Sequence, residues 1–174
     1  DFAEVLKARR FELITALQPE VARVHTDLST AAETLILAYE PGFHQGHLSD
    51  ELFSLREEEA RTRVTAAGPH RDDLRLTLNG LDAMTFASEG QQRSAALSLK
   101  IAQACALESA FGKPPLLLLD DVFGELDSLR RRALLRLLPV GSQKIITTTT
   151  LDWVRDEPVT GLIYKVEAAS LSAH

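Results

Sequence analysis

The sequence predicts an α/β fold, in which a doubly wound parallel sheet follows a mostly helical segment. Three observations predict it. Apolar residues recur at spacings of three and four from residue 1 to about residue 32, which is typical of amphipathic helix. Expected strands and helices alternate from about residue 86 onward, which indicates βαβ units. The run Leu116–Leu119 has no polar alternation and therefore predicts a central strand that is covered on both faces.

Residues 1–66 predict a small, mostly helical lobe. We expect Pro19 to kink or divide the first helix, because proline lacks the amide hydrogen that the helix needs there. The pattern changes to a strand over Glu33–Glu40, and a polar surface helix is expected from residue 49 to about residue 63. The rest of the chain, residues 67–174, is expected to form a second unit.

The second unit begins with a hairpin pattern. Leu74–Asn79 alternates apolar and polar residues, Asn79-Gly80 is a type I′ turn signal, and a second extended run is expected over Leu81–Phe86. Ser88 is placed to cap a long helix over residues 89–111, which ends at a glycine. The remaining expected elements are a helix at 128–138, a strand at 144–148, a short helix at 152–155 and a last strand at 161–167.

The composition sets limits on the class of protein. With 45% hydrophobic residues the chain is not intrinsically disordered, and no apolar run is long enough to cross a bilayer, so we expect no membrane association. Cys105 is the only cysteine, which excludes a disulfide within the chain and fits the cytoplasm. The net charge of −6 means that any contact with DNA needs a local basic surface, another part of the protein or an assembly.

The N-terminal residue is not a methionine, and Met84 is the only one in the chain. The first residues already follow the helical pattern, and they contain no signal or transit sequence. We therefore expect this sequence to be a piece of a longer protein.

Two adjacent carboxylates follow the four-leucine strand. Asp120 and Asp121 stand at its carboxyl end, where open α/β sheets bind their ligands. One carboxylate can hold Mg²⁺, directly or through water, while the other orients an attacking water. The alternative is a structural cap beyond the strand, but neighbouring half-buried carboxylates without a cation cost free energy.

The start of the long helix is a candidate anion site. Ser88, Gly90 and Gln91 lie at the expected first turn, where free amide groups and the helix dipole favour a negative charge. Taken alone, such residues more often mark only a well-capped helix.

The order of these motifs resembles the head of an ABC-type ATPase. A glycine-bearing helix start, about 20 residues of helix, a leucine strand ending in Asp-Asp and then Gly-Glu-Leu-Asp are similar to the signature motif, Walker B motif and D-loop. The strings Gly-Pro-His-Arg-Asp-Asp from residue 68, Ser-Glu-Gly-Gln-Gln-Arg from residue 88 and Leu-Leu-Leu-Leu-Asp-Asp-Val-Phe-Gly-Glu-Leu-Asp from residue 116 resemble the C-terminal half of the RecF family, which is related to SMC proteins.

The resemblance implies a role for each of these residues. Asp120 would bind Mg²⁺ and Asp121 would position the hydrolytic water. Ser88, Gly90 and Gln91 would reach the γ-phosphate of ATP bound to the opposite subunit of a homodimer, with Asp127 as the D-loop aspartate at the interface. Thr149 would occupy the position of the switch histidine of many ABC ATPases. An ordinary end of a β-branched strand is the alternative for Thr149.

The resemblance also implies a biological role. RecF-type proteins are ATP-dependent DNA-binding proteins of replication, recombinational repair and the SOS response, which dimerise with ATP at gapped or ss–dsDNA junctions. They act with RecR and RecO to help load RecA, and slow hydrolysis releases them. We expect such a protein in the cytoplasm, at the nucleoid.

One part of an ATPase is missing from the sequence. No G-x-x-x-x-G-K-[ST] phosphate loop occurs, so this chain alone is expected not to hydrolyse ATP. Two alternatives remain: half of an SMC-type head, which long heptad-patterned arms should precede, and a non-hydrolysing dimerisation or interaction module. A phosphate loop in the sequence before residue 1 would support the ATPase.

Two charged segments have no role fixed by their spacing. In His70–Asp73, a buried Arg–Asp pair at the joint between lobes and a contact with DNA or nucleotide are equally compatible with the sequence. Arg130–Arg132 and Arg136 form the densest basic cluster, either a solvated helix face or a phosphate-contacting surface.

Overall fold

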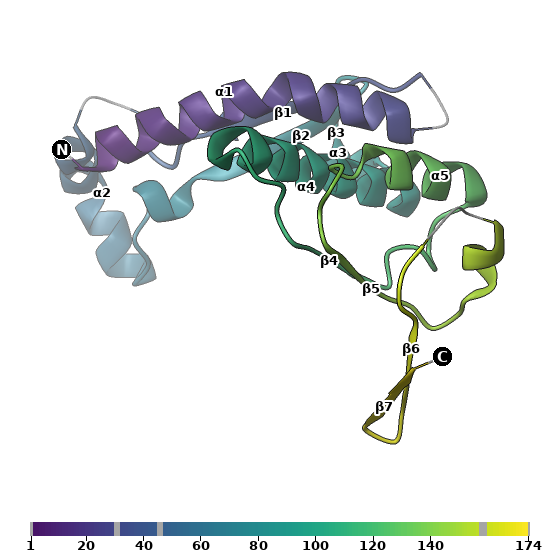
Figure 1. Ribbon diagram of the computed structural model, residues 1–174. Coiled ribbons are helices and arrows are strands. Elements are labelled where there is room, and N and C mark those ends of the chain that lie inside the picture. The colour runs from purple at the N-terminus through teal and green to yellow at the C-terminus, as the bar shows by residue number, and fades with distance from the viewer. Residues whose placement is uncertain (1, 30–31, 45–46, 157–159, 174) are drawn as a thin grey trace.

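The computed structural model describes residues 2–29, 32–44, 47–156 and 160–173 (Figure 1). The helices are α1 (Phe2–Leu28), α2 (Leu48–Thr62), η1 (Pro69–Arg71), α3 (Ala83–Phe86), α4 (Glu89–Phe111), α5 (Ser128–Leu137) and η2 (Asp152–Asp156). The strands are β1 (Leu35–Glu40), β2 (Asp73–Leu78), β3 (Leu81–Asp82), β4 (Leu117–Asp120), β5 (Lys144–Thr147), β6 (Tyr164–Glu167) and β7 (Ser170–Ala173). Within these ranges, no helix has the length and apolar character that crossing a membrane requires.

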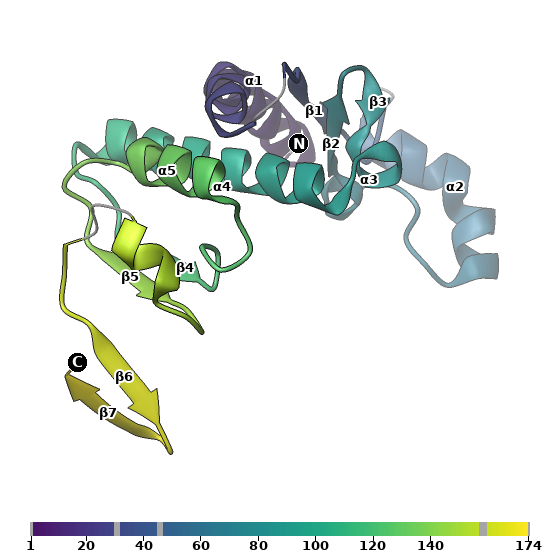
Figure 2. The ribbon, with the colours of Figure 1, turned by 90° about the vertical axis from the view of Figure 1, so that its right-hand side faces the viewer.

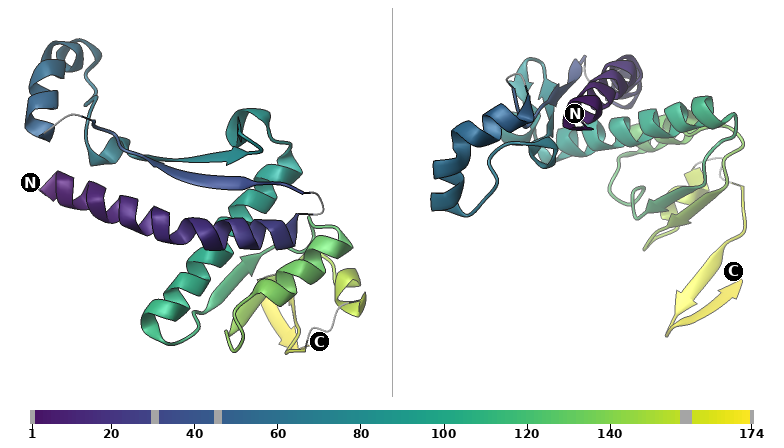
Figure 3. Two further views of the ribbon diagram at one scale, coloured as in Figure 1. Left: turned by 90° about the horizontal axis from the view of Figure 1, so that it is seen from above. Right: turned by 90° about the vertical axis from the view of Figure 1, so that its left-hand side faces the viewer.

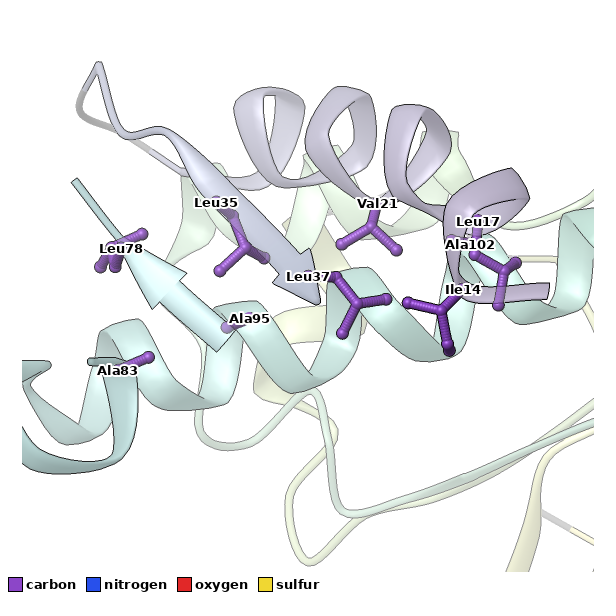
Figure 4. Packing of buried hydrophobic residues seen from close by; sticks show 9 residues of the cluster. All are labelled: Ile14, Leu17, Val21, Leu35, Leu37, Leu78, Ala83, Ala95 and Ala102. Carbon is purple, nitrogen blue, oxygen red and sulfur yellow. The ribbon is translucent and has the colours of Figure 1, made fainter. Parts of the chain in front are cut away.

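The central feature of the fold is the packing of α1 across α4, with β1 running beside α1 (Figures 1 and 3). Figure 4 shows the core that joins these elements. Its buried residues are Ile14, Leu17 and Val21 of α1, Leu35 and Leu37 of β1, Leu78 of β2, Ala83 of α3, and Ala95 and Ala102 of α4. The alanines of α4 let the helices approach closely, and burial of the aliphatic side chains stabilises the contact.

Helix α1 continues through Pro19, so the expected division of the helix is wrong, whereas the alternative of a kink stays a prediction. Leu17 before the proline and Val21 after it are both buried, so the two halves of the helix share one packed face. Packing along this face offsets the hydrogen bond that Pro19 cannot make.

Strands β1, β2 and β3 form an antiparallel sheet in which Leu35 lies opposite Leu78. The turn between β2 and β3 is confirmed: Asn79 and Gly80 have φ angles of 53° and 81°, the left-handed values that a type I′ turn requires. The second strand of the hairpin is much shorter than expected. It ends at Asp82, whose side chain accepts a hydrogen bond from the Thr85 amide and starts α3 in place of an extended run to Phe86.

The expected boundary between residues 66 and 67 stays a prediction, and strand pairing crosses it. Glu40 at the end of β1 lies opposite Asp73 at the start of β2. The Gly68 amide donates to the Gly42 carbonyl at 3.0 Å, so the chain leaves the sheet and returns to it at neighbouring points. Helix α2 lies on this excursion, away from the α1–α4 core (Figure 2).

Strands β4 and β5 pair in parallel, as the α/β pattern predicts, with α5 connecting them along the chain. One face of β4 contributes Leu117 and Leu119 to a core around Phe123, Leu134 and Trp153. The other face is open among the described residues, since Leu118 is 70% exposed. The expectation that both faces of this strand are covered is therefore not met by the described residues.

Strands β6 and β7 form an antiparallel hairpin that stands away from the helices (Figures 1 and 2). Strand β7 was not expected from the sequence. Its turn uses Ala168 and Ala169, whose φ angles are 47° and 59°, in place of the glycine or asparagine that would signal such a turn.

Candidate functional site

The candidate site begins at the carboxyl ends of β4 and β5. Asp120, the last residue of β4, lies opposite Thr147, the last residue of β5. The Thr147 hydroxyl donates a hydrogen bond to Asp120 Oδ1, and the Asp121 amide donates to the Thr147 carbonyl at 3.1 Å. The same amide also lies 3.1 Å from the Thr147 hydroxyl oxygen, so Thr147 fixes the Asp120 carboxylate and the Asp121 backbone together.

Asp121 has an unusual backbone and an unpaired carboxylate oxygen. Its φ angle is 49°, in the left-handed region that costs a non-glycine residue about 1 kcal/mol. Its Oδ1 is buried and has no hydrogen-bond partner among the described residues. A Cβ placed on Gly124 would lie 3.0 Å from this oxygen, so glycine leaves the carboxylate its space. A buried acceptor without a partner fits the hydrogen of an ordered water or a bound cation.

Two aromatic rings anchor the segment that follows the aspartates. The ring centroids of Phe123 and Trp153 lie 4.6 Å apart at an interplanar angle of 10°. Phe123 is fully buried and Trp153 is 4% exposed. The stack holds the segment after Asp121 against η2, on the core side of the sheet.

Ser88 to Gln91 form the turn that begins α4, hereafter the signature-like turn. Ser88 Oγ accepts from the Gln91 amide at 3.3 Å, and Gln91 Oε1 accepts from the Ser88 amide at 2.8 Å, which completes a capping box. Gln91 Nε2 donates to Glu33 Oε1 at 2.8 Å. Both ends of the Gln91 amide are thus used inside the chain, whereas Ser88 lies exposed at the helix start.

Asp127 caps α5 beside the signature-like turn. Its Oδ1 accepts from the Arg130 amide at 2.9 Å, and its Oδ2 lies 3.2 Å from Arg130 Nη1. The same Nη1 lies 3.8 Å from the position of a Cβ on Gly90. Arg93 of α4 adds an ion pair to Glu125 at 3.0 Å. These contacts bring the signature-like turn and residues 124–127 together.

Asp72 joins α1 to the antiparallel sheet. Its carboxylate, 6% exposed, pairs with Arg10 and accepts hydrogen bonds from the Tyr39 hydroxyl at 2.5 Å and the Gly42 amide at 2.8 Å. Burial alone would raise the pKa of Asp72, but the hydrogen bonds from Tyr39, Gly42 and Arg10 outweigh burial and lower it. Burial and the bond to Asp72 raise the pKa of Tyr39 to about 12. The structure thus shows an Arg–Asp pair at this segment, but its arginine is the partly exposed Arg10 of α1. Arg71 of the segment donates instead to the Thr65 carbonyl at 2.9 Å, and the alternative of a contact with DNA or nucleotide stays a prediction.

Comparison with known proteins gives a consistent result over the whole chain. The chain is 41% identical, over 95% of its length, to the DNA replication and repair protein RecF of Symbiobacterium thermophilum. It is 39% identical, over 97% of its length, to the protein of the same name from Halalkalibacterium halodurans. A solved structure of the recombination mediator protein RecF-ATPrS in the RecFOR pathway matches 98% of the chain with a TM-score of 0.78 and 28% identity.

The chain matches the C-terminal half of RecF proteins. It spans about half the length of the curated relatives it matches, 48% of each RecF named above, and 47% of the RecF-ATPrS chain. Its fold is accordingly that of one part of an ABC-type ATPase head, as in RecF. No protein-family model matches the chain.

The structure adds Thr147, Arg93 and Glu125 to the candidate site. The hydroxyl that contacts Asp120 belongs to Thr147, whereas Thr149 lies exposed beyond the strand, and its role stays a prediction. The parallel register, which aligns the last residues of β4 and β5, is the signal that could have identified Thr147. Arg93 and Glu125, which link α4 to the segment before α5, have no signal in the sequence beyond their charges.

The magnesium site expected at Asp120 also stays a prediction. Among the described residues, no group of three or more His, Cys, Asp or Glu side chains is gathered to hold a metal. The buried, unpaired oxygen of Asp121 next to Asp120 is the feature of the structure that fits a hydrated cation.

Proposed function

We propose that this chain supplies two parts of an ATP-dependent, DNA-binding recombination mediator. One is the aspartate pair at the end of β4, which binds the metal and orients the water for ATP hydrolysis. The other is the signature-like turn, which closes the ATP site of a second subunit. The observation that carries the proposal is the aspartate pair at the end of β4. Asp120 is held by Thr147, and Asp121 keeps a buried carboxylate oxygen free of protein partners among the described residues.

The two aspartates take different roles in hydrolysis. Asp120 holds Mg²⁺, directly or through water, and Thr147 fixes the carboxylate that does so. When bound, the metal neutralises charge that develops on the phosphate oxygens. Asp121 Oδ1 accepts a hydrogen from the attacking water and so orients it. Gly124 leaves room for the Asp121 carboxylate in this position.

The signature-like turn faces the other subunit. The Ser88 hydroxyl and the backbone at Gly90, at the positive end of the 23-residue helix α4, contact the γ-phosphate of ATP bound to the partner. Gln91 contributes to this contact through the capping box, which shapes the turn. Asp127 lies at the same interface, and exposed Thr149 hydrogen-bonds phosphate through its hydroxyl.

The proposed biological role follows from the relatives. They are DNA replication and repair proteins, and the structural neighbours are recombination mediators of the RecFOR pathway. We infer that ATP binding drives homodimerisation on DNA at gaps or ss–dsDNA junctions, and that slow hydrolysis releases the dimer. The protein acts with RecR and RecO to help load RecA during repair and the SOS response, in the cytoplasm at the nucleoid.

Two substitutions in the full-length protein test the two roles separately. Asp120→Asn is expected to abolish Mg²⁺-dependent ATP hydrolysis, because an amide does not hold the cation as a carboxylate does. Ser88→Arg is expected to leave nucleotide binding unchanged and to block ATP-dependent dimerisation, because it places a bulky cation at the interface. Phosphate release and sedimentation velocity with ATP measure the two effects.

Asp50→Asn, on the exposed surface of α2, is the matched control and should change neither property. Normal ATP-dependent dimerisation of Ser88→Arg would refute the role of the signature-like turn. ATP-dependent dimerisation without measurable hydrolysis in the unaltered protein would favour a non-hydrolysing interaction module. The present chain alone, which carries no phosphate loop, is expected to release no phosphate from Mg·ATP.

A further inference from the structure

A chain of buried polar side chains runs from the end of α1 to the signature-like turn. His25 of α1 is fully buried, and the Glu33 side chain is 9% exposed. His25 Nε2 lies 3.1 Å from Glu33 Oε2, and Glu33 Oε1 accepts from Gln91 Nε2 at 2.8 Å. Gln91 then accepts from the Ser88 amide. A residue of α1 is thus connected to the backbone of the turn through two side chains.

A second route connects His25 to the same turn. His25 Nδ1 lies 3.2 Å from the hydroxyl of Ser98, which is itself fully buried. Ser98 Oγ donates its hydrogen to the Ser94 carbonyl at 2.7 Å, so it must accept from His25 Nδ1–H. Ser94 Oγ in turn donates to the Gly90 carbonyl at 2.9 Å. Both routes end within the signature-like turn.

Fold stability alone does not account for this arrangement. A histidine and a carboxylate buried together lose hydration, and apolar side chains of similar size often stabilise such a position as well or better. The polar pair instead fixes the orientation of the groups that it contacts, because hydrogen bonds are directional. The group at the end of the chain is the Gln91 amide, which shapes the turn through the capping box.

We propose that Glu33 and His25 are positioning residues for the signature-like turn. They hold the Gln91 amide, and through it the turn that presents Ser88 and Gly90 to ATP on the partner subunit. This inference rests on the proposed function of the turn. It adds that the closing of the partner's ATP site depends on side chains contributed by α1 and by the segment before β1.

The first test compares carboxylate truncations in the full-length protein. Glu33→Ala is expected to weaken ATP-dependent dimerisation by about tenfold or more, because the Gln91 amide loses a charged acceptor. ATP binding to the separate subunits should be unchanged. Glu12→Ala, which removes an exposed carboxylate paired with Arg9, is the matched control and should change neither property. Sedimentation velocity and titration with a fluorescent ATP analogue measure the two.

Conservative variants separate positioning from folding. Glu33→Gln keeps a carbonyl oxygen for Gln91 and offers an amide to His25, so dimerisation should recover towards the level of the unaltered protein. Gln91→Glu places a second carboxylate against Glu33 and should weaken dimerisation, and adding Glu33→Gln should restore it by exchanging the two groups. This exchange also tests the inference if Glu33→Ala does not fold.

The outcomes distinguish this inference from the function on which it rests. If Ser88→Arg blocks dimerisation but Glu33→Ala lowers only the melting temperature, Glu33 is merely structural and the inference is overturned. Failure of the exchange to restore dimerisation in folded protein would also overturn it. If Ser88→Arg itself dimerises normally with ATP, the proposed function fails first.

Discussion

Asp72 accepts hydrogen bonds from groups that reach it from separate parts of the chain: Arg10 on α1, Tyr39 on β1 and the amide of Gly42. The Arg10 side chain is 39% exposed, so solvent screens that pair, and the buried bonds from Tyr39 and Gly42 contribute most to stability. A single carboxylate therefore connects α1, β1 and the segment after β1, in addition to the apolar core that packs α1 on the sheet. Its neighbours His70, Arg71 and Asp73 are exposed.

Replacing Asp72 by alanine should destabilise the protein in a pH-dependent way. At pH 7 we expect a loss of about 2 kcal/mol in the free energy of unfolding, since buried donors lose a charged acceptor. The pKa of Asp72 is lowered in the folded state. Its contribution is therefore present above the ordinary carboxyl pKa of about 4 and is lost as pH falls through the folded-state pKa. Urea unfolding between pH 7 and pH 2.5 measures this difference.

Asp73→Ala is the matched control, because its carboxylate is exposed and bonds only to the adjacent Leu74 amide among the contacts that the structure describes. It should change stability little at any pH. A loss for Asp72→Ala that stayed constant down to pH 2.5 would contradict the role of the charge.

At the scale of elements, the sequence predicts those helices and strands whose ends carry typical capping or turn residues, and it does not predict the others. Helix α4 occupies residues 89–111 as expected, because a serine cap and a terminal glycine mark its ends. The strand β7 was missed because two alanines form its turn, and α3 was missed because an apolar sequence concealed the Asp82 cap. Thr147 was missed because its contact with Asp120 depends on the register of two strands far apart in sequence.

The aromatic stack makes a prediction about the element that follows β4. Phe123→Leu should destabilise the protein by about 1 kcal/mol, through lost burial and lost stacking on Trp153. Trp153 is the only tryptophan of the chain, so its emission reports the change directly. We expect a shift of the emission maximum to longer wavelength and a lower melting temperature for Phe123→Leu.

Phe53→Leu is the control for this substitution, since Phe53 is 77% exposed on α2 and away from the stack. It should leave both the emission and the melting temperature unchanged. Identical emission of Phe123→Leu and the unaltered chain would show that the stack does not shield Trp153.

At the scale of the whole molecule, the most distinctive feature is apolar surface on strands. Leu118 on β4 is 70% exposed, Ile145 on β5 is 49% exposed and Leu171 on β7 is 67% exposed. An isolated two-stranded ribbon such as β6–β7 has little stability of its own in water. Apolar strand surface of this kind promotes association.

The isolated chain is therefore expected to bind the dye ANS and to associate at micromolar concentration. Leu118→Ser should reduce both effects, because it removes the most exposed leucine of β4 without touching the core. Dye fluorescence and light scattering during gel filtration measure them. Leu129→Ser, at a 62% exposed site on α5, is the matched control. Equal dye binding by all three proteins would contradict a contribution from β4.

The point at which the chain leaves β1 and returns to β2 has a consequence for how such proteins can vary. Glu40 lies opposite Asp73, and the Gly68 amide donates a hydrogen bond to the Gly42 carbonyl. The two ends of the excursion between β1 and β2 therefore lie side by side. Insertions and deletions within this excursion need not disturb the register of the sheet, since loop closure costs rise slowly with length. The exposed helix α2 within this excursion, and not the closely packed segments at its two ends, is thus a natural place to graft a peptide tag or a fluorescent reporter, and for evolution to exchange one surface module for another.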